Sequence, residues 1–182
     1  PDMLYAAVTI APVNGGKLVS VDSAPAEAMP GVKRVVRLEE AVAVVADSYW
    51  RASTALAKLD PKFDDAGHGG VSSATIFDAF DKALGAPPEM PAGAATVVTA
   101  DYRVPFLAHA TMEPMNCTAR VKDGKVEIWV PTQVPQMARA AAARTAGVDI
   151  DKVSVHVTLL GGGFGRRLEV DAIDALERDV ID

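Results

Sequence analysis

A glycine-rich run near the end of the printed sequence has the composition of a ligand-binding loop. The stretch TLLGGGFGRRLEVD at 158–171 sets glycines around Phe164, after an apolar strand pattern and before a helical one. Glycine lets backbone N–H groups approach a ligand with no Cβ in the way, and a helix N-terminus favours anions. The guanidinium groups of Arg166 and Arg167 suit a pyrophosphate. The run therefore predicts a ligand cradle, with a tight turn beside a closely packed helix as the alternative.

Two familiar phosphate-binding motifs are excluded by the spacing of this run. A P-loop ends in Gly-Lys-Ser/Thr, but Arg166 and Arg167 stand at that place, so the hydroxyl that binds Mg²⁺ is missing. A dinucleotide-binding fingerprint counted from Gly161 needs glycine at 166, and one counted from Gly163 needs glycine where Leu168 stands. The glycine run must therefore serve another ligand or a purely structural turn.

The remaining residues with chemical potential favour structural roles. His109 and Glu113 lie in a loop-like segment, where a buried polar group mostly satisfies hydrogen bonds. His156 alternates onto the polar face of a strand, and His68 lies in a linker. Cys117 is expected to be a small buried residue and not a nucleophile. Because no spacing suggests a zinc site or a nucleophile elbow, we assign neither a catalytic residue nor a metal ligand to the chain.

The composition is that of a globular protein with a real core. The 182 residues are 49% apolar and 23% charged, with a net charge of −6, and the pI near 5.0 disfavours nucleic acid and anionic membranes as partners. One cysteine excludes an intrachain disulfide, and no apolar run approaches the roughly 18 residues of a membrane span. Because Pro1 leads almost at once into an apolar strand, we expect a piece of a longer protein or a processed form.

The first part of the chain predicts a compact α+β lobe over 1–71. Its periodicity changes between two residues and about 3.6 residues, which gives the order β-β-α-β-β-α over 1–65. The expected strands are 3–12, 17–22, 32–39 and 41–47, and the expected helices are 23–31 and 48–60.

The second part, 72–182, predicts a lobe in which a mixed sheet is paired with helices. A Gly/Ser/Asp-rich linker at 64–75 separates it from the first lobe, and the Pro-rich segment 86–93 is expected to be a loop. The helix patterns cover 73–85, 135–147 and 168–182, the last with an apolar stripe of Val170, Ile173, Leu176 and Val180. The strand patterns are 96–104, a hairpin over 116–130 with Asp-Gly at its turn, and 152–160.

The motifs together carry a family resemblance. GGGFGRR at 161–167 resembles the glycine loop of the molybdopterin-binding large subunit in the molybdenum hydroxylase (xanthine oxidase) family, and most of all its isoquinoline 1-oxidoreductase β-subunit and aldehyde dehydrogenase branch. LAHATMEPMNCTA at 107–119 is similar to the family's H-x-x-MEP segment, and WVPTQVPQ at 129–136 to its TQ loop. Residues 3–36 resemble the α/β hammerhead lobe that precedes the cofactor domain. The resemblance implies a hammerhead-like lobe followed by part of a molybdopterin-binding lobe.

The resemblance also implies roles for single residues. Gln133 matches a glutamine that hydrogen-bonds an oxygen on molybdenum, and Phe164 lies in the loop that packs against the metal's ligand face. Leu168 stands where many relatives have a glutamate, which argues against purine-like recognition. The cofactor-binding positions that follow from the resemblance are Gln133, Gly162, Gly163, Phe164, Gly165, Arg166 and Arg167.

The function that the resemblance implies belongs to a larger protein. It is the hydroxylation of an N-heteroaromatic compound or the oxidation of an aldehyde, with oxygen derived from water, by molybdenum-molybdopterin in its cytosine dinucleotide form. A single cysteine cannot hold an iron–sulfur cluster, so a small 2Fe-2S ferredoxin-like subunit is the expected partner, beside the rest of the large subunit.

The isolated chain is then expected to be inactive, because no catalytic base is present in it. The bacterial periplasm or cell envelope is the compartment that the resemblance suggests, with the cytoplasm as the alternative. A cofactor-free binding or scaffold module on the same fold is the competing function, since a fold does not determine a function.

Overall fold

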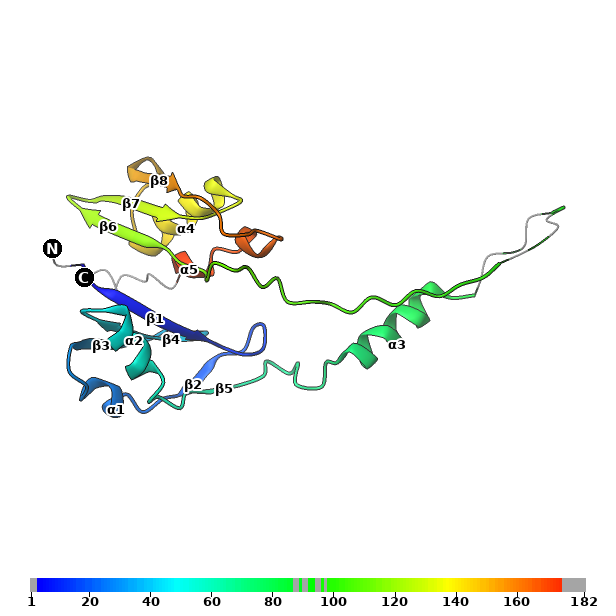
Figure 1. Cartoon of the computed structure of the whole chain (residues 1–182), viewed down its shortest axis with the longest axis horizontal. Helices are drawn as coiled ribbons and strands as arrows, with labels where there is room; N and C mark the ends of the chain where they lie inside the picture. Colours follow the sequence, from blue (N-terminus) through cyan, green and yellow to red (C-terminus); the bar gives the residue numbers. More distant parts are fainter. Residues whose placement is uncertain (1–2, 87–88, 90–91, 94–95, 97, 175–182) are drawn as a thin grey trace. The chain divides into compact units, whose positions relative to one another are not determined.

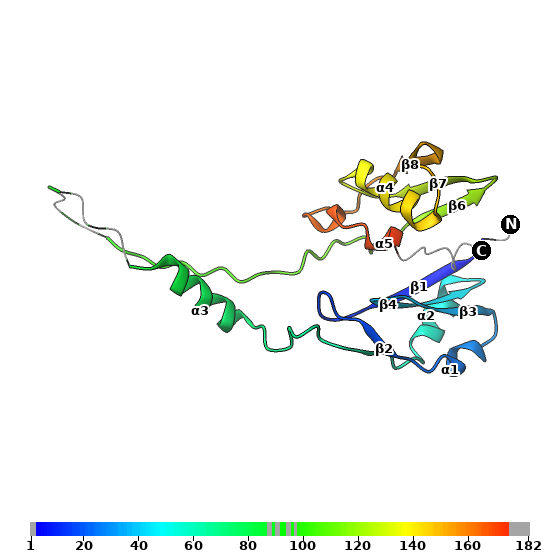
Figure 2. The same ribbon diagram turned by 180° about the vertical axis from the view of Figure 1, so that it is seen from behind.

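A computed structural model describes residues 3–86, 89, 92–93, 96 and 98–174. The chain divides into two compact units, one made of Pro1–Ala66 with His109–Asp182 and the other of Gly67–Ala108 (Figures 1 and 2). The expected lobe boundary between residues 71 and 72 stays a prediction. Across the described residues, no helix is long and apolar enough to cross a membrane.

The first lobe is built on an antiparallel sheet in the order β1-β4-β3. Its strands are β1 (Tyr5–Ile10), β3 (Val32–Arg37) and β4 (Ala41–Ala46), and β4 is buried along its whole length because it lies between the other two. The helices α1 (Ala24–Glu27) and α2 (Tyr49–Leu56) follow the expected order. A second, two-stranded sheet joins β2 (Leu18–Ser20) to the unpredicted β5 (Lys62–Phe63).

Small side chains let α2 pack closely on this sheet. Ala52 and Ala55 are fully buried, and Ala52 packs with Ala7 of β1 and Ala46 of β4. The helix begins after Ser48, whose hydroxyl accepts a hydrogen bond from the backbone of Arg51. The expected α+β class is therefore confirmed for this lobe.

The second unit contains the helix α3 (Ser73–Leu84), which begins with a capping box between Ser72 and Thr75. Among its described residues none is buried. Its contacts with the segment after it include the ring pair of Phe80 and Phe106, with centroids 6.4 Å apart, and the ion pair of Arg103 and Asp81.

The expected strand at 96–104 is wrong for the described residues 96 and 98–104, which form no strand. A strand needs backbone hydrogen bonds from a neighbouring strand, and the described part of 67–108 offers none. The described residues of the expected loop at 86–93 form neither helix nor strand, and the others (87–88 and 90–91) lie outside the description.

The sheet of the 109–182 segment is mixed, as predicted. Its order is β6-β7-β8, with β6 (Thr118–Lys122) antiparallel and β8 (Val153–Val157) parallel to β7 (Lys125–Val130). The turn between β6 and β7 is the predicted Asp123-Gly124 pair, whose φ angles of 51° and 70° are both positive.

The helix α4 (Pro135–Ala146) connects β7 to β8, with a short 3-10 turn η1 (Ile150–Lys152) before β8. Alanines of α4 pack on the apolar face of the sheet, so that Ala138 and Ala141 are buried against Ile128 and Val130. After β8 follow the glycine loop, the 3-10 turn η2 (Arg166–Leu168) and α5 (Asp171–Asp174). The apolar stripe predicted for the last helix begins as expected, because Ile173 is buried in this core, whereas Leu176 and Val180 lie outside the described residues.

Candidate functional site

The glycine loop has a backbone that ordinary residues rarely adopt. Gly162 and Gly165 have φ angles of 101° and 85°, and Phe164 between them has a φ of 51°. A side chain at positive φ meets the backbone, so glycine suits these places and a phenylalanine there is unusual. The ring of Phe164 nevertheless stays 72% exposed, which means that burial of the ring is not what holds it there.

Two other glycines have close neighbours. A Cβ on Gly161 would lie 2.3 Å from the Cβ of Glu113, and a Cβ on Gly163 would lie 2.9 Å from the side-chain oxygen of Gln133. Both distances are shorter than real contacts of a Cβ. The loop therefore lies directly against the segment that carries Glu113 and against the segment that carries Gln133.

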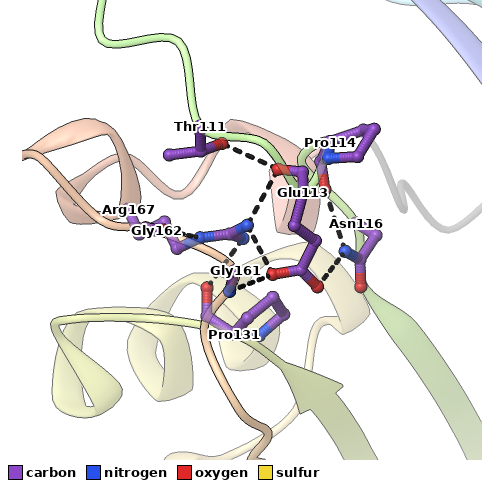
Figure 3. A network of polar contacts seen from close by, with 8 residues as sticks. All are labelled: Thr111, Glu113, Pro114, Asn116, Pro131, Gly161, Gly162 and Arg167. Carbon is purple, nitrogen blue, oxygen red and sulfur yellow. Dashed lines mark hydrogen bonds and ion pairs between the residues drawn. The ribbon is translucent and has the colours of Figure 1, made fainter.

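Arg167 joins these segments from inside the protein (Figure 3). Its side chain is fully buried, and its Nε donates to the carbonyl oxygen of Gly162 at 2.8 Å. Its Nη1 donates to the carbonyl of Pro131 at 3.2 Å. Its Nη2 donates to Glu113 twice, to the backbone carbonyl at 3.0 Å and to the carboxylate at 2.6 Å.

Glu113 completes this network on the other side. The same carboxylate oxygen accepts from the backbone N–H of Gly161 at 2.8 Å, and the other oxygen accepts from the amide of Asn116 at 2.9 Å. These hydrogen bonds, first that of Gly161, then that of Asn116, and then the charge of Arg167, hold the pKa of Glu113 below its ordinary value. The carboxylate is thus charged at neutral pH and balances the buried guanidinium.

The backbone of Arg167 holds Gln133 in place. The carbonyl oxygen of Arg167 accepts from the backbone N–H of Gln133 at 3.0 Å and from the hydroxyl of Thr132 at 3.3 Å. That hydroxyl in turn accepts from the N–H of Val134 at 3.0 Å, just where α4 begins. The side chain of Gln133 is exposed beside Gly163, and within the described residues its amide makes no hydrogen bond.

The site residues predicted from the sequence divide into two groups. Gln133, Gly162, Gly163, Phe164 and Gly165 are brought together on one accessible rim. The two arginines are engaged elsewhere: Arg166 makes a two-pronged ion pair with Asp171, which raises the pKa of its guanidinium, and Arg167 is buried.

Both arginines thus have acceptors within this chain. The pyrophosphate contact of Arg166 stays a prediction. For Arg167 the structure supports a positioning role, because its guanidinium has no exposed atom to offer.

Sequence reasoning missed the link between Glu113 and Arg167. Glu113 was expected to have only a structural role at a turn, and no spacing pattern pairs residues 54 positions apart. The one available signal was that both lie in motifs of the same family. His109 was likewise expected to be structural. Its ring lies next to the glycine loop, because a Cβ built on Gly165 would be 3.5 Å from it.

The other candidates lie away from this rim. His156 is about half exposed, as expected, and stacks on Trp129 with ring centroids 4.9 Å apart. Burial raises the pKa of the Cys117 thiol to about 12, which fits the expected unreactive cysteine. Within the described ranges, no cluster of three or more His, Cys, Asp or Glu side chains could hold a metal ion.

The rim has the donors that a cofactor with oxygen-rich groups requires. The backbone N–H groups of 162–165 donate no hydrogen bond to any described residue, although their neighbours 161 and 166 do. The three glycines carry no Cβ over their N–H groups, and Phe164 adds an exposed aromatic surface. Backbone amides and an aromatic wall are the groups by which proteins bind and orient large cofactors, so these residues fit such a group.

Comparison with known proteins identifies the family of the chain. Residues 71–176 match the family model described as the molybdopterin cofactor-binding domain. Isoquinoline 1-oxidoreductase subunit beta from Brevundimonas diminuta is 32% identical over 199 residues, which cover 95% of this chain and 25% of the relative. The membrane-bound aldehyde dehydrogenase (pyrroloquinoline-quinone) of Gluconacetobacter polyoxogenes is 30% identical, over 93% of this chain and 24% of the relative. The chain therefore spans about a quarter of the length of these curated relatives.

Solved structures share the fold. Quinoline 2-oxidoreductase from Pseudomonas putida 86 superimposes with a TM-score of 0.67 at 19% identity, over 98% of this chain and 30% of that one. Aldehyde oxidoreductase from Desulfovibrio gigas gives 0.64 at 19% identity, over 94% of this chain and 25% of that one. Since the matched family model spans more than half of the chain and contains the glycine loop, Gln133 and Glu113, the chain belongs to the molybdopterin cofactor-binding domain family of the molybdenum hydroxylases.

Proposed function

We propose that this chain forms one wall of the molybdopterin site in a molybdenum-dependent oxidoreductase. The observation that carries the proposal is the rim described above, where the unpaired N–H groups of 162–165 lie beside the unpaired side-chain amide of Gln133. A purely structural turn does not require both sets of groups to stay unpaired. A cofactor that accepts hydrogen bonds along one face satisfies both.

Each residue of the rim has a definable task toward that cofactor. When bound, molybdenum-molybdopterin supplies a redox centre that carries the oxidation chemistry. The N–H groups of 162–165 bind its acceptor atoms, and the side-chain amide of Gln133 hydrogen-bonds a polar atom near the metal. The ring of Phe164 excludes water from the same face. Arg166, which is only partly exposed, reaches the phosphate part if its ion pair with Asp171 opens.

The finer identity of the cofactor and its partners follows from the resemblance. We propose the cytosine dinucleotide form of molybdopterin, a small 2Fe-2S subunit that accepts the electrons, and the rest of the large subunit as the second wall. For the compartment we propose the periplasm or cell envelope, which the name of the membrane-bound relative supports, with the cytoplasm as the alternative.

The proposed reaction inserts oxygen from water into a small molecule. The substrate is an N-heteroaromatic compound or an aldehyde, in keeping with the names of the two relatives. Two carboxylates that contact the glycine loop or its arginines, Glu113 and Asp171, are paired with Arg167 and Arg166. A base for the reaction is therefore sought in the rest of the protein, and the isolated chain is inactive.

The test uses the full-length protein, produced in a host that assembles molybdopterin. The purified enzyme is supplied with a dye, an aldehyde or an N-heterocycle, and ¹⁸O-labelled water. We expect dye reduction together with ¹⁸O in the product of one of the two substrate classes. A protein that contains no molybdenum and reduces no dye would favour the cofactor-free scaffold instead.

A further inference from the structure

We propose that Arg167 and Glu113 form a positioning pair that sets the cofactor-facing rim before the cofactor arrives. The inference rests on the proposed function, because it concerns the same rim. It goes further in assigning the order of the loop to two residues that do not themselves face the cofactor. Figure 3 shows the pair at the centre of its contacts.

The pair draws together segments that are distant in the sequence. Arg167 donates to Pro131, which is 36 positions away, and to Glu113, which is 54 positions away. Its Nε holds the carbonyl of Gly162, while the carboxylate of Glu113 holds the N–H of Gly161. The first peptide groups of the loop are therefore fixed from both sides by one ion pair.

The same arginine also sets the other half of the rim. Its backbone carbonyl accepts from the N–H of Gln133 and from the hydroxyl of Thr132. A displacement of Arg167 thus moves the N–H groups of the glycine loop and the amide of Gln133 at the same time. This coupling explains how the glycine loop and the loop that carries Gln133 keep their positions relative to each other.

The chemistry of the pair requires these residue types. A guanidinium is a planar fork whose N–H groups point in several fixed directions, whereas a lysine ammonium is a compact point charge. Only the fork can serve Gly162, Pro131 and Glu113 together. Because the guanidinium is completely buried, its charge needs a carboxylate partner, and Glu113 supplies one while keeping its own side chain 31% exposed.

The pair is separate from the hydrophobic core that folds this part of the chain. The core cluster consists of side chains from the sheet, α4 and α5, such as Ile128, Ala138 and Ile173, and includes neither Arg167 nor Glu113. Loss of the pair is therefore expected to loosen the rim while the sheet and α4 remain folded. This separation makes a positioning role testable.

The experiment compares Arg167→Gln, Arg167→Lys and Glu113→Gln in the full-length protein, with Arg120→Gln as the matched control. Arg120 also pairs with a glutamate, Glu127, but on the exposed surface of β6 and β7. Hydrogen–deuterium exchange is measured for peptides that cover 159–166 and 118–130, and molybdenum per protein is measured in parallel.

We expect Arg167→Gln and Glu113→Gln to speed exchange at 159–166 by about tenfold or more, with little change at 118–130. Molybdenum content falls in the same two variants. Arg167→Lys restores both readouts in part, because the charge is kept and the fork is lost. Arg120→Gln behaves as the wild type.

Two results would overturn the positioning role. The first is unchanged exchange at 159–166 in Arg167→Gln, and the second is an equal rise at 118–130, which would make the pair a general stabiliser of the fold. A wild-type protein without molybdenum would instead refute the proposed function, while the exchange data would still decide the role of the pair.

Discussion

At the residue scale, the account depends on Gly163, where the loop comes nearest to Gln133. A Cβ there would lie 2.9 Å from the Gln133 oxygen and 3.0 Å from its amide carbon. Any larger residue must displace Gln133 or the loop, and either movement changes the face that the cofactor meets.

Gly163→Val in the full-length protein is expected to abolish molybdenum binding, because a β-branched side chain would cover the backbone N–H groups that the cofactor must approach. Metal analysis of the purified variant checks this. Gly70→Val is the matched control, because a Cβ at Gly70 has no atom within 4 Å and its φ is not in the left-handed region. Normal molybdenum content in Gly163→Val would remove the loop from the site.

Gln133→Ala is expected to give a different phenotype. The cofactor stays bound, because the N–H groups of the loop remain, but kcat per molybdenum falls by about tenfold to hundredfold through the loss of one hydrogen bond to a charged centre. Gln136→Ala, on the exposed side of α4, serves as the control. Equal turnover in the two variants would show that Gln133 has no role near the metal.

Glu113 predicts a pH dependence of stability. Its pKa is held below the ordinary 4.5, so the native state favours the charged carboxylate and gains stability above that value. As the pH falls through the lowered pKa, this stability is lost. In urea unfolding of the 182-residue chain from about pH 7 to about pH 3, we expect the wild type to lose more stability than Glu113→Gln. Parallel curves would contradict the lowered pKa.

The sequence could predict the residues of the rim but not what holds them. Gln133, Phe164 and the glycines lie in short motifs whose local order carries the signal. The pairing of Arg167 with Glu113 depends on how distant segments fold together, which no local pattern encodes. For the same reason, Arg167 looked like an exposed anion-binding residue when it was considered together with Arg166.

At the element scale, short sequence patterns predicted the helices and strands whose stabilising contacts lie close in the sequence. The Asp123-Gly124 turn and the alternating strands beside it sufficed to place the hairpin of β6 and β7. The pattern at 96–104 has the composition of a strand as well, but a strand exists only where another strand offers hydrogen bonds. β5 was missed because a strand of two residues has no recognisable sequence pattern of its own. It is identified as a strand only by its pairing with β2.

The end of α4 provides a test at this scale. Gly147 has a φ of 65°, and its N–H donates to the carbonyl of Arg144 at 3.2 Å. We expect Gly147→Ala to lower the free energy of unfolding of the 182-residue chain by about 1 kcal/mol, since other residues adopt this left-handed backbone at a cost. Gly70→Ala, without such a φ, is the control. Equal urea midpoints would contradict the role of this cap.

At the scale of the whole molecule, the rim lies among apolar side chains that the chain leaves uncovered. Met112 and Leu159 are 94% and 95% exposed, and Leu160 and Leu168 are also exposed. Exposed apolar surface of this kind is typical of a face that meets another structure. We infer that the rest of the subunit covers this face and encloses the cofactor between two walls.

The isolated 182-residue chain is consequently expected to fold but to hold no molybdenum, even when it is produced in a host that makes the cofactor. A large cofactor needs most of its surface enclosed for tight binding, and one wall is not enough. Far-ultraviolet circular dichroism checks the folding, and metal analysis checks the cofactor. Stoichiometric molybdenum in the isolated chain would show that the second wall is not needed.

The central claim is that this chain supplies a wall of a molybdopterin site. Its most direct test is the molybdenum-to-protein ratio of the full-length protein from a cofactor-producing host, measured beside Gly163→Val. We predict about one molybdenum per wild-type subunit and almost none in the variant, because a β-branched side chain at 163 would stand where the loop backbone must approach the cofactor. A wild-type protein that folds normally and contains no molybdenum, or a variant that retains it in full, would contradict the account.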